Sequence, residues 1–303
     1  MREGHGLWNN VAKNLQERSL SWLMLVITPA AAGCLVTGCG GGQTTPLDSN
    51  VSPVTDGDWY RPGVATSWQW QLQAGAGGEI NTDYNVDVYD IDLFEVSEAQ
   101  IQQLQDDGRK VVCYFSAGSY EDFRADAGEF DPADYGNTLE GFEDENWLDI
   151  RSPNVRRIML QRLDLAVVKG CDGVEPDNVD GFLNSTGFDL TGTDQLAFNR
   201  FIANEAHARG LAVALKNDLE QIPALVDYFD FAVNEQCHEF DECEANDPFI
   251  AAQKPVFNVE YAARFRDDPE QQEAMCAAAR ARNLRTLVLP LDLDDSFRIS
   301  CDP

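Results

Sequence analysis

The sequence contains little histidine, few basic residues and no short-spaced cysteine pair. Only three His are present (His5, His207, His238) and no Cys-x-x-Cys spacing occurs, so a zinc site is not expected. Nothing else in the sequence indicates a metal or cofactor, and we expect none. Lys and Arg number 22 against 52 Asp and Glu, a formal net charge of -30, so the protein would repel the phosphates of nucleic acids. These absences exclude nucleic acid as a partner and disfavour zinc chemistry.

The chain begins with a segment typical of export. Arg2, Lys13 and Arg18 precede an apolar run, and the run ends in "LVTGC", a pattern similar to a bacterial lipobox. We therefore predict a lipoprotein signal peptide over residues 1–38 and lipidation of Cys39. A cut before Cys34 and an uncleaved membrane helix are the alternatives.

The predicted anchor has consequences for domains and location. Residues 39–58 are rich in small and polar residues and are expected to be a flexible tether. Residues 59–303 would then form one domain, which at 44% hydrophobic content can build a real core. The protein should be exported and held at the cell envelope by its lipid alone. With Gly40 after the cysteine, the outer membrane is expected if the cell is Gram-negative.

Six further cysteines follow the anchor, an even number that suggests disulfides in an exported chain. Cys237 and Cys243 are close enough to close one loop. Spacing alone does not choose among the pairings of the other four, Cys113, Cys171, Cys276 and Cys301.

Strand-like and helix-like segments alternate through the domain. Eight apolar runs predict strands, and they occupy residues 68–73, 86–94, 110–116, 173–179, 211–218, 229–236, 255–261 and 285–293. Helical patterns with caps lie between most of them, at residues 97–107, 152–170, 193–210 and 268–283. Alternating strands and helices imply a parallel sheet, and no Gly-rich phosphate motif follows any strand. The sequence therefore predicts an α/β fold, a single-domain (β/α)8 TIM barrel.

Acidic residues stand where several of these strands end. The stretch "KGCDGVEPDNVDGF" places Glu175 and Asp177 at one strand end, and Glu235 stands at another. In such barrels the chemistry occurs at the carboxyl ends of the strands. Carboxylates paired without metal ligands indicate the hydrolysis of glycosidic bonds. Aromatic residues nearby, Tyr261 among them, would either stack on sugar rings or fill the core.

Six segments together, "YDIDLF", "VVCYFSAGS", "GCDGVEPDNVD", "ALKND", "NEQCHEFDEC" and "VFNVEY", resemble glycoside hydrolase family 114. The resemblance runs from about Trp68 to Asp292. It implies a TIM-barrel endo-α-1,4-polygalactosaminidase whose catalytic acids match Asp177 and Glu235. By analogy with retaining α-glycosidases, Asp177 would be the nucleophile and Glu235 the general acid/base, although the two roles could be reversed. The residues expected to line the substrate subsites are Asp90, Tyr114, Glu175, Asn178, Lys216, Asn234, Glu260 and Asp292.

The same resemblance implies the partner and the disulfides. A cationic or partly acetylated galactosamine polysaccharide would be drawn to the acidic protein, which is expected to be a monomer. The implied barrel suits the bridges Cys113–Cys171, Cys237–Cys243 and Cys276–Cys301. Two other functions stay open: a glycosidase for a neutral α-galactoside, and a surface lipoprotein that binds exopolysaccharide without cleaving it.

Overall fold

The computed structural model describes residues 47–75 and 78–302. The predicted signal peptide and Cys39 lie outside the described residues, so both stay predictions. Within the described ranges, no helix has the length and apolar character needed to cross a membrane.

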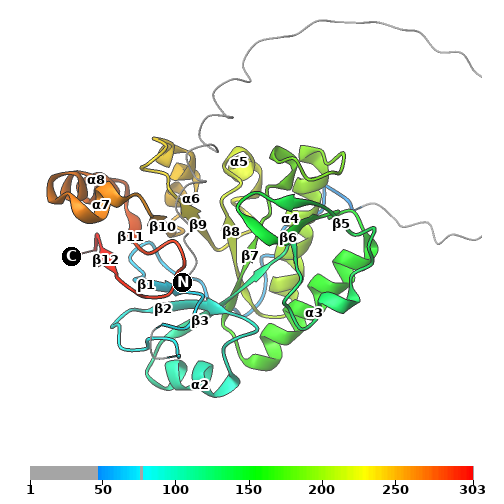
Figure 1. The fold of residues 1–303 in the computed structure, drawn as a ribbon, viewed down its shortest axis with the longest axis horizontal. Helices are drawn as coiled ribbons and strands as arrows, with labels where there is room; N and C mark the ends of the chain where they lie inside the picture. Colours follow the sequence, from blue (N-terminus) through cyan, green and yellow to red (C-terminus); the bar gives the residue numbers. More distant parts are fainter. Residues whose placement is uncertain (1–46, 76–77, 303) are drawn as a thin grey trace, which may run out of the picture.

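Eight parallel strands form the centre of the fold and follow one another around the sheet in chain order (Figure 1). They are β1 (Trp68–Gln71), β2 (Val88–Asp92), β3 (Lys110–Ser116), β7 (Gly173–Asp177), β8 (Ala212–Lys216), β9 (Phe231–Glu235), β10 (Val256–Glu260) and β11 (Leu284–Val288). A short strand, β12 (Ile299–Ser300), pairs antiparallel with β11. Each of the eight predicted strands is present, and the predicted barrel architecture is confirmed.

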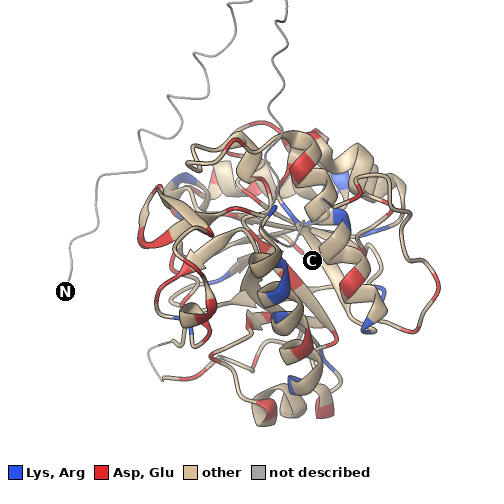
Figure 2. Cartoon of the chain, turned by 90° about the vertical axis from the view of Figure 1, so that its right-hand side faces the viewer, with Lys and Arg blue, Asp and Glu red and all other residues tan. Residues whose placement is uncertain are grey.

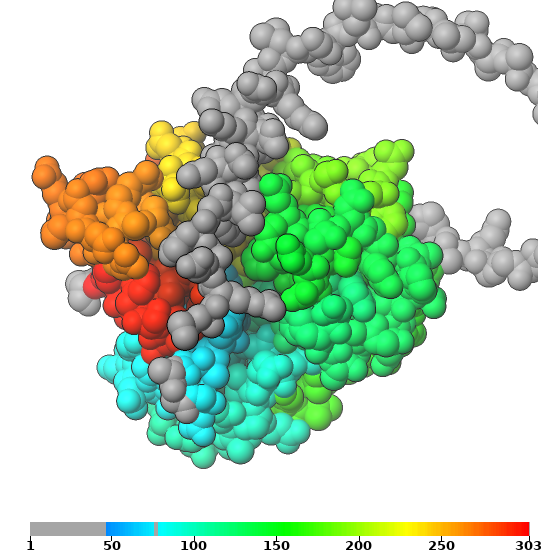
Figure 3. All heavy atoms as spheres, in the orientation of Figure 1, coloured from blue at the N-terminus to red at the C-terminus, as the bar shows by residue number. Residues whose placement is uncertain are grey.

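The first and last parts of the sheet meet through side chains and loops. The indole N–H of Trp68 on β1 donates to the carbonyl oxygen of Arg285 on β11 at 2.8 Å. Beyond the strands, the N–H of Leu72 donates to the carbonyl of Leu293 at 3.1 Å. The space-filling view shows the C-terminal segment (red) seated between the first strands (cyan) and the last helices (orange) (Figure 3). These contacts bring β1 and β11 together.

The longer helices between the strands, α2 (Glu98–Asp106), α3 (Pro153–Lys169), α4 (Gly192–Ala208) and α8 (Pro269–Arg282), begin where the sequence supplies a side-chain cap. The shorter helices are α5 (Ile222–Leu225), α6 (Asp247–Ala251) and α7 (Ala263–Asp267). Ser152 caps α3, Pro153 occupies its first turn, and Gly170 ends it in the left-handed conformation with φ of 84°. Short 3-10 turns lie at Ala127–Glu129, Gly181–Leu183, Leu219–Gln221 and Cys243–Asn246.

The core has two layers, because parallel strands are buried on both faces. Residues such as Trp70, Val112 and Phe231 point into the barrel and pack together. Residues such as Ile91 and Cys113 on the opposite face pack against the helices. The parity of a residue within its strand therefore decides whether its side chain faces the barrel interior or the helix layer.

A small antiparallel sheet interrupts the barrel between β3 and α3. Its strands are β4 (Ser119–Glu121), β5 (Tyr135–Leu139) and β6 (Phe142–Leu148), with β6 in the middle. The register sets Glu121 on β4 opposite Glu145 on β6. Because this sheet follows a barrel strand at its carboxyl end, it lies at the end of the barrel where the predicted site is found.

The described residues contain three disulfides: Cys113–Cys171, Cys237–Cys243 and Cys276–Cys301. They are the bridges that the resemblance implied. Residues that precede the first strand are bound to α4, since Asn204 accepts from the N–H of Val54 at 2.8 Å and donates to the carbonyl of Ser52 at 3.0 Å. The domain boundary at residue 58 stays a prediction.

Candidate active site

Asp177 and Glu235 lie at the carboxyl ends of β7 and β9, with Lys216 at the end of β8 between them. The Lys216 ammonium is 3.1 Å from Asp177 Oδ1 and 3.4 Å from Glu235 Oε2. Burial works against the charge of Lys216, but the carboxylates around it outweigh burial and raise the pKa of Lys216 well above its usual value. One buried cation thus holds the two predicted catalytic acids together.

The bridge also limits the separation of the two acids. The distance between Asp177 Oδ1 and Glu235 Oε2 cannot exceed the sum of their distances to Lys216 Nζ, 3.1 and 3.4 Å. The carboxyl groups of retaining glycosidases are about 5–5.5 Å apart, which lies within this limit. Those of inverting glycosidases are about 6.5–9.5 Å apart, a range whose lower end equals the limit. The geometry is therefore compatible with a retaining pair.

Asp177 is surrounded by donors that stabilise its charged form. Besides Lys216, the N–H of Asn178 donates to Oδ1 at 2.7 Å and the Tyr114 hydroxyl donates to Oδ2 at 3.1 Å. Burial, reinforced by the charge of Asp177, raises the pKa of Tyr114 well above its usual value, so Tyr114 stays a donor. The Asp177 side chain is 18% exposed, which leaves it accessible to a ligand.

Glu235 is held by residues from the two neighbouring strands. The Tyr261 hydroxyl, just past β10, donates to Oε1 at 2.6 Å, and the side-chain amide of Asn217 donates to Oε2 at 3.2 Å. Asn217 adopts the left-handed conformation, with φ of 48°, and its side-chain oxygen Oδ1 also accepts from the N–H of Glu235 at 3.0 Å. With 26% of its side chain exposed, Glu235 is the more accessible of the two acids.

Asp90 and Glu175 point into the barrel beneath this pair, and neither has any exposed surface. Burial raises the pKa of Asp90 to about 7. Burial and the neighbouring Asp90 carboxylate raise the pKa of Glu175 well above its usual value. The two residues belong to the predicted set, but without exposure they are placed to support the site rather than to contact a sugar.

Three other predicted subsite residues are not among the hydrogen-bond and ion-pair partners described for the two acids. Glu260 and Asn234 occupy positions on the side of their strands that faces the helices, and they are 0% and 1% exposed. The Glu260 carboxylate accepts the N–H groups of His238 at 2.8 Å and Glu239 at 3.2 Å, in the loop that follows Glu235. Asp292 is exposed in the loop after β11. Glu260 therefore orders the loop behind the acid, a role that differs from the predicted one.

Glu145 is an acid beside the pair that the sequence analysis did not include. It comes from β6 of the small sheet, and its Oε2 accepts the hydroxyl of Ser119 at 2.6 Å. The amide of Asn178 donates to the same hydroxyl at 3.3 Å, which links Glu145 to the residue after Asp177. Burial raises the pKa of Glu145 to about 7, and the charge of Asp177 contributes. The strand β6 has the sequence FEDENWL, and its four consecutive polar residues gave no signal that distinguishes Glu145.

Two more acids stand in the loops after β7 and β8. Burial raises the pKa of Asp180 to about 6, with the charges of Asp177 and Glu235 contributing. Burial raises the pKa of Asp218 to about 8, and Asp180 adds to the effect. Acidic residues also occur on helices and loops around the barrel, mixed with fewer basic ones (Figure 2). The site is distinguished by buried acids that share one lysine.

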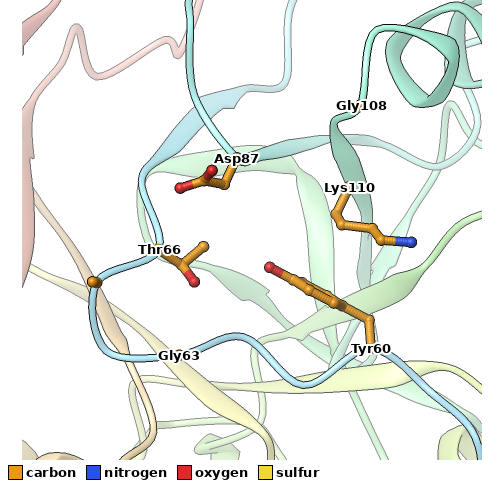
Figure 4. Close-up of a pocket in the computed structure, with 7 residues that line it drawn as sticks. Tyr60, Gly63, Thr66, Asp87, Gly108 and Lys110 are labelled. Carbon is orange, nitrogen blue, oxygen red and sulfur yellow. The ribbon is translucent and has the colours of Figure 1, made fainter.

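Two other features of the described chain have residues that could bind a ligand. Cys237, His238 and Cys243 are the only metal-ligating cluster in the described part of the chain, but the two sulfurs form a disulfide and are unavailable to a metal. A shallow depression is lined by Tyr60, Gly63, Ala65, Thr66, Asp87, Gly108 and Lys110 (Figure 4). It lies at the amino ends of β2 and β3, away from the acids, and Asp87 already accepts from Ser67 at 2.7 Å.

Comparison with known proteins agrees with this geometry. Residues 49–303 match the model of glycoside-hydrolase family GH114. The structure of Aspergillus fumigatus Ega3 in complex with galactosamine is 41% identical, with a TM-score of 0.76, and the match covers 82% of this chain and 99% of that one. No curated protein matches the chain.

More distant structures share the fold. The glycoside hydrolase domain of PelA from Pseudomonas aeruginosa is 16% identical with a TM-score of 0.60, covering 79% of this chain and 99% of that one. The trehalulose synthase MutB from Pseudomonas mesoacidophila is 11% identical with a TM-score of 0.51, covering 74% of this chain and 64% of that one.

Proposed function

The chain belongs to glycoside-hydrolase family GH114, and we propose that it cleaves α-1,4-linked galactosamine-rich polysaccharide with Asp177 and Glu235 as its catalytic pair. The observation that carries the proposal is the Lys216 ammonium within 3.1 Å of Asp177 and 3.4 Å of Glu235, at the end of the barrel where such enzymes act. The galactosamine bound to Ega3, a relative of 41% identity, supports the choice of sugar.

The surroundings of each acid support a division of roles in a double displacement. A nucleophile must be ionised, and of the two acids Asp177 has the nearer ammonium, at 3.1 Å against 3.4 Å for Glu235. In the first step Glu235 protonates the glycosidic oxygen while Asp177 attacks the anomeric carbon, so that the C–O bond breaks and a glycosyl ester forms. In the second step Glu235 takes a proton from water, and the water oxygen replaces Asp177 at that carbon.

The charge of the site supports a cationic substrate. Glu145 and Asp180 stand near Asp177, with Asp218 near Asp180, and all three have raised pKa values because burial outweighs the opposing effects of nearby hydrogen bonds and bases. Ammonium groups on deacetylated galactosamine would supply the missing positive charge. Cleavage should therefore weaken as ionic strength rises, whereas a salt-independent rate on this polymer would argue that the acids serve solubility.

The three disulfides support an exported protein, because such bridges persist in oxidising compartments. We further propose that Cys39 carries the lipid that holds the enzyme at the envelope, with the domain acting as a monomer. Palmitate labelling of the full-length chain and of Cys39→Ala tests the anchor. Equal labelling of the two would refute it.

The function is tested with residues 47–303 and partially deacetylated galactosaminogalactan, following released oligosaccharides by mass spectrometry. Asp177→Asn and Glu235→Gln, which keep the shape of each side chain, should release none while melting as the parent does. Cleavage by both variants would refute the catalytic pair. Retention of an uncut polymer would favour a binding protein, and cutting only of neutral or acetylated chains would change the substrate.

A further inference from the structure

Two buried carboxylates beneath the catalytic pair have no donor of their own. Asp90 on β2 and Glu175 on β7 are both 0% exposed. No N–H or O–H group in the described part of the chain donates to any of their four oxygens. The nearest cation is Lys216, whose ammonium lies 3.5 Å from Glu175 Oε1. A fully buried carboxylate without donors is costly to keep ionised.

The charges around Lys216 do not balance if every acid is ionised. One ammonium would then serve Asp177, Glu235, Glu175 and, behind it, Asp90. Neighbouring carboxylates in a buried site avoid such an excess of negative charge by sharing a proton. The charge of one carboxylate then raises the pKa of the other. Burial raises the pKa of both Asp90 and Glu175, and the Asp90 charge raises that of Glu175 further.

We propose that Asp90 and Glu175 share one proton and act together as a singly charged counter-ion for Lys216. This inference rests on the proposed roles of Asp177 and Glu235. A single negative charge below Lys216 offsets part of the electrostatic effect of the ammonium on the two catalytic acids. Lys216 can then hold Asp177 in place without drawing the acid proton from Glu235. Asp90 and Glu175 are thus positioning residues that act through Lys216.

The groups that face this pair come from several strands. Lys216 approaches from β8, Asp177 from the end of β7, and Tyr114 from β3. On β1, the Trp70 ring lies 4.7 Å from the Lys216 ammonium and contributes no charge. Of these groups only Lys216 is positive, so a loss of charge from the pair acts directly on the lysine.

Three variants distinguish the possible charge states of the pair. In Asp90→Asn and in Glu175→Gln, an amide N–H replaces the shared proton, and the remaining carboxylate keeps the single negative charge. Each should leave the alkaline limb of the kcat/KM pH profile unchanged. The double variant loses the last negative charge, so that limb should move to lower pH by about one unit, because Lys216 then favours ionised Glu235. Glu98→Gln, an exposed acid on α2, is the matched control.

Two outcomes would overturn the proposal. If each single variant moves the limb by about half the shift of the double variant, both carboxylates are ionised. If the double variant leaves the alkaline limb of the pH profile in place, the pair carries no charge that affects Lys216. A uniform loss of kcat with an unchanged pH profile would likewise indicate a packing role alone.

A second measurement needs no activity. Infrared spectroscopy at pH 8 is made on the parent and on Asp218→Asn, because burial raises the pKa of Asp218 to about 8 and its carboxyl would add a band of its own. The C=O stretch of a protonated buried carboxyl should persist in Asp218→Asn, and its absence there would overturn the shared proton. An inactive parent that shows this band would refute the proposed function while leaving the proton pair intact. The two failures are therefore distinguishable.

Discussion

Replacement of Lys216 by Met tests the centre of the site, because it removes the charge and keeps the apolar stem. The ammonium is 3.5, 3.1 and 3.4 Å from Glu175, Asp177 and Glu235, and its side chain is 3% exposed. A Met side chain can lie against the Trp70 ring, since thioethers pack well on aromatic rings. The variant should fold, with its buried carboxylates left without a counter-ion.

The expected loss follows from the cost of an unpaired buried charge. Removing one partner of a buried ion pair costs about 3–5 kcal/mol, and in a domain of this size each kcal/mol shifts Tm by about 2–4 °C. A fall in Tm of roughly 6–20 °C at pH 8 is therefore expected.

The loss should be smaller at pH 5. The folded variant can discharge the site by binding an extra proton, whereas its unfolded chain titrates normally. Where the folded state binds more protons than the unfolded state, stability falls as pH rises, so this part of the stability is present at low pH and lost toward high pH.

Calorimetry of the parent and variant at pH 5 and pH 8, at one ionic strength, measures both effects. Lys110→Met is the matched control, because Lys110 pairs with Asp172 at 2.7 Å with 45% of its side chain exposed. That surface pair should contribute less than about 1 kcal/mol at either pH. An equal destabilisation of Lys216→Met at both pH values would refute the electrostatic reasoning.

Three further changes test the residues around the pair. Tyr261→Phe removes a hydrogen-bond donor 2.6 Å from Glu235. It should lower kcat/KM roughly ten- to a hundred-fold, because a hydrogen bond to a charged group contributes about that much. Unchanged kinetics would refute this role. Glu145→Gln should slow cleavage of deacetylated chains about five-fold and leave acetylated chains unaffected. An equal change on both substrates, or the same effect from the exposed control Glu143→Gln on β6, would contradict ammonium recognition. The parent should become less stable as pH rises toward 8, because burial raises the pKa of Asp218 to about 8 and the folded state holds its proton longer. Asp218→Asn should flatten that slope in thermal melts, and an unaltered slope would show that other groups cause it.

The sequence was sufficient to predict the barrel because its strands are apolar and end at polar residues. Asp177 and Glu235 stand at such ends, and the carboxyl ends of parallel strands meet at one end of the barrel. Local capping signals were equally clear: Ser152 and Gly170 bound α3 in the structure as the sequence predicts.

Whether an individual strand residue faces the barrel interior or the helices could not be predicted in the same way. In "VFNVEY" both Val256 and Phe257 are apolar, because parallel strands are buried on both sides and hydrophobicity does not reveal parity. The structure shows that Phe257 faces the interior, which carries Tyr261 to Glu235 and turns Glu260 toward the loop behind it. The sequence alone offered Glu260 as the site residue.

The small antiparallel sheet was missed for another reason. The strand β6 has the sequence FEDENWL, in which four consecutive polar residues resemble a solvated loop. It pairs with β5 across a short turn, with register shifts along the pair, and its pairing with β4 sets Ser119 opposite Trp147, far along the chain. Glu145 could therefore be placed beside Asp177 only from the structure.

Azide rescue tests the assignment of the two acids most directly. The substrate is an aryl α-glycoside of a galactosamine oligosaccharide, incubated with azide and either Asp177→Gly or Glu235→Gly, and the products are identified by NMR. The account predicts a β-glycosyl azide from Asp177→Gly, because azide replaces the nucleophile, and an α-glycosyl azide from Glu235→Gly, because azide attacks the enzyme ester. The opposite products would exchange the two roles, and no rescue of either variant would contradict catalysis by this pair.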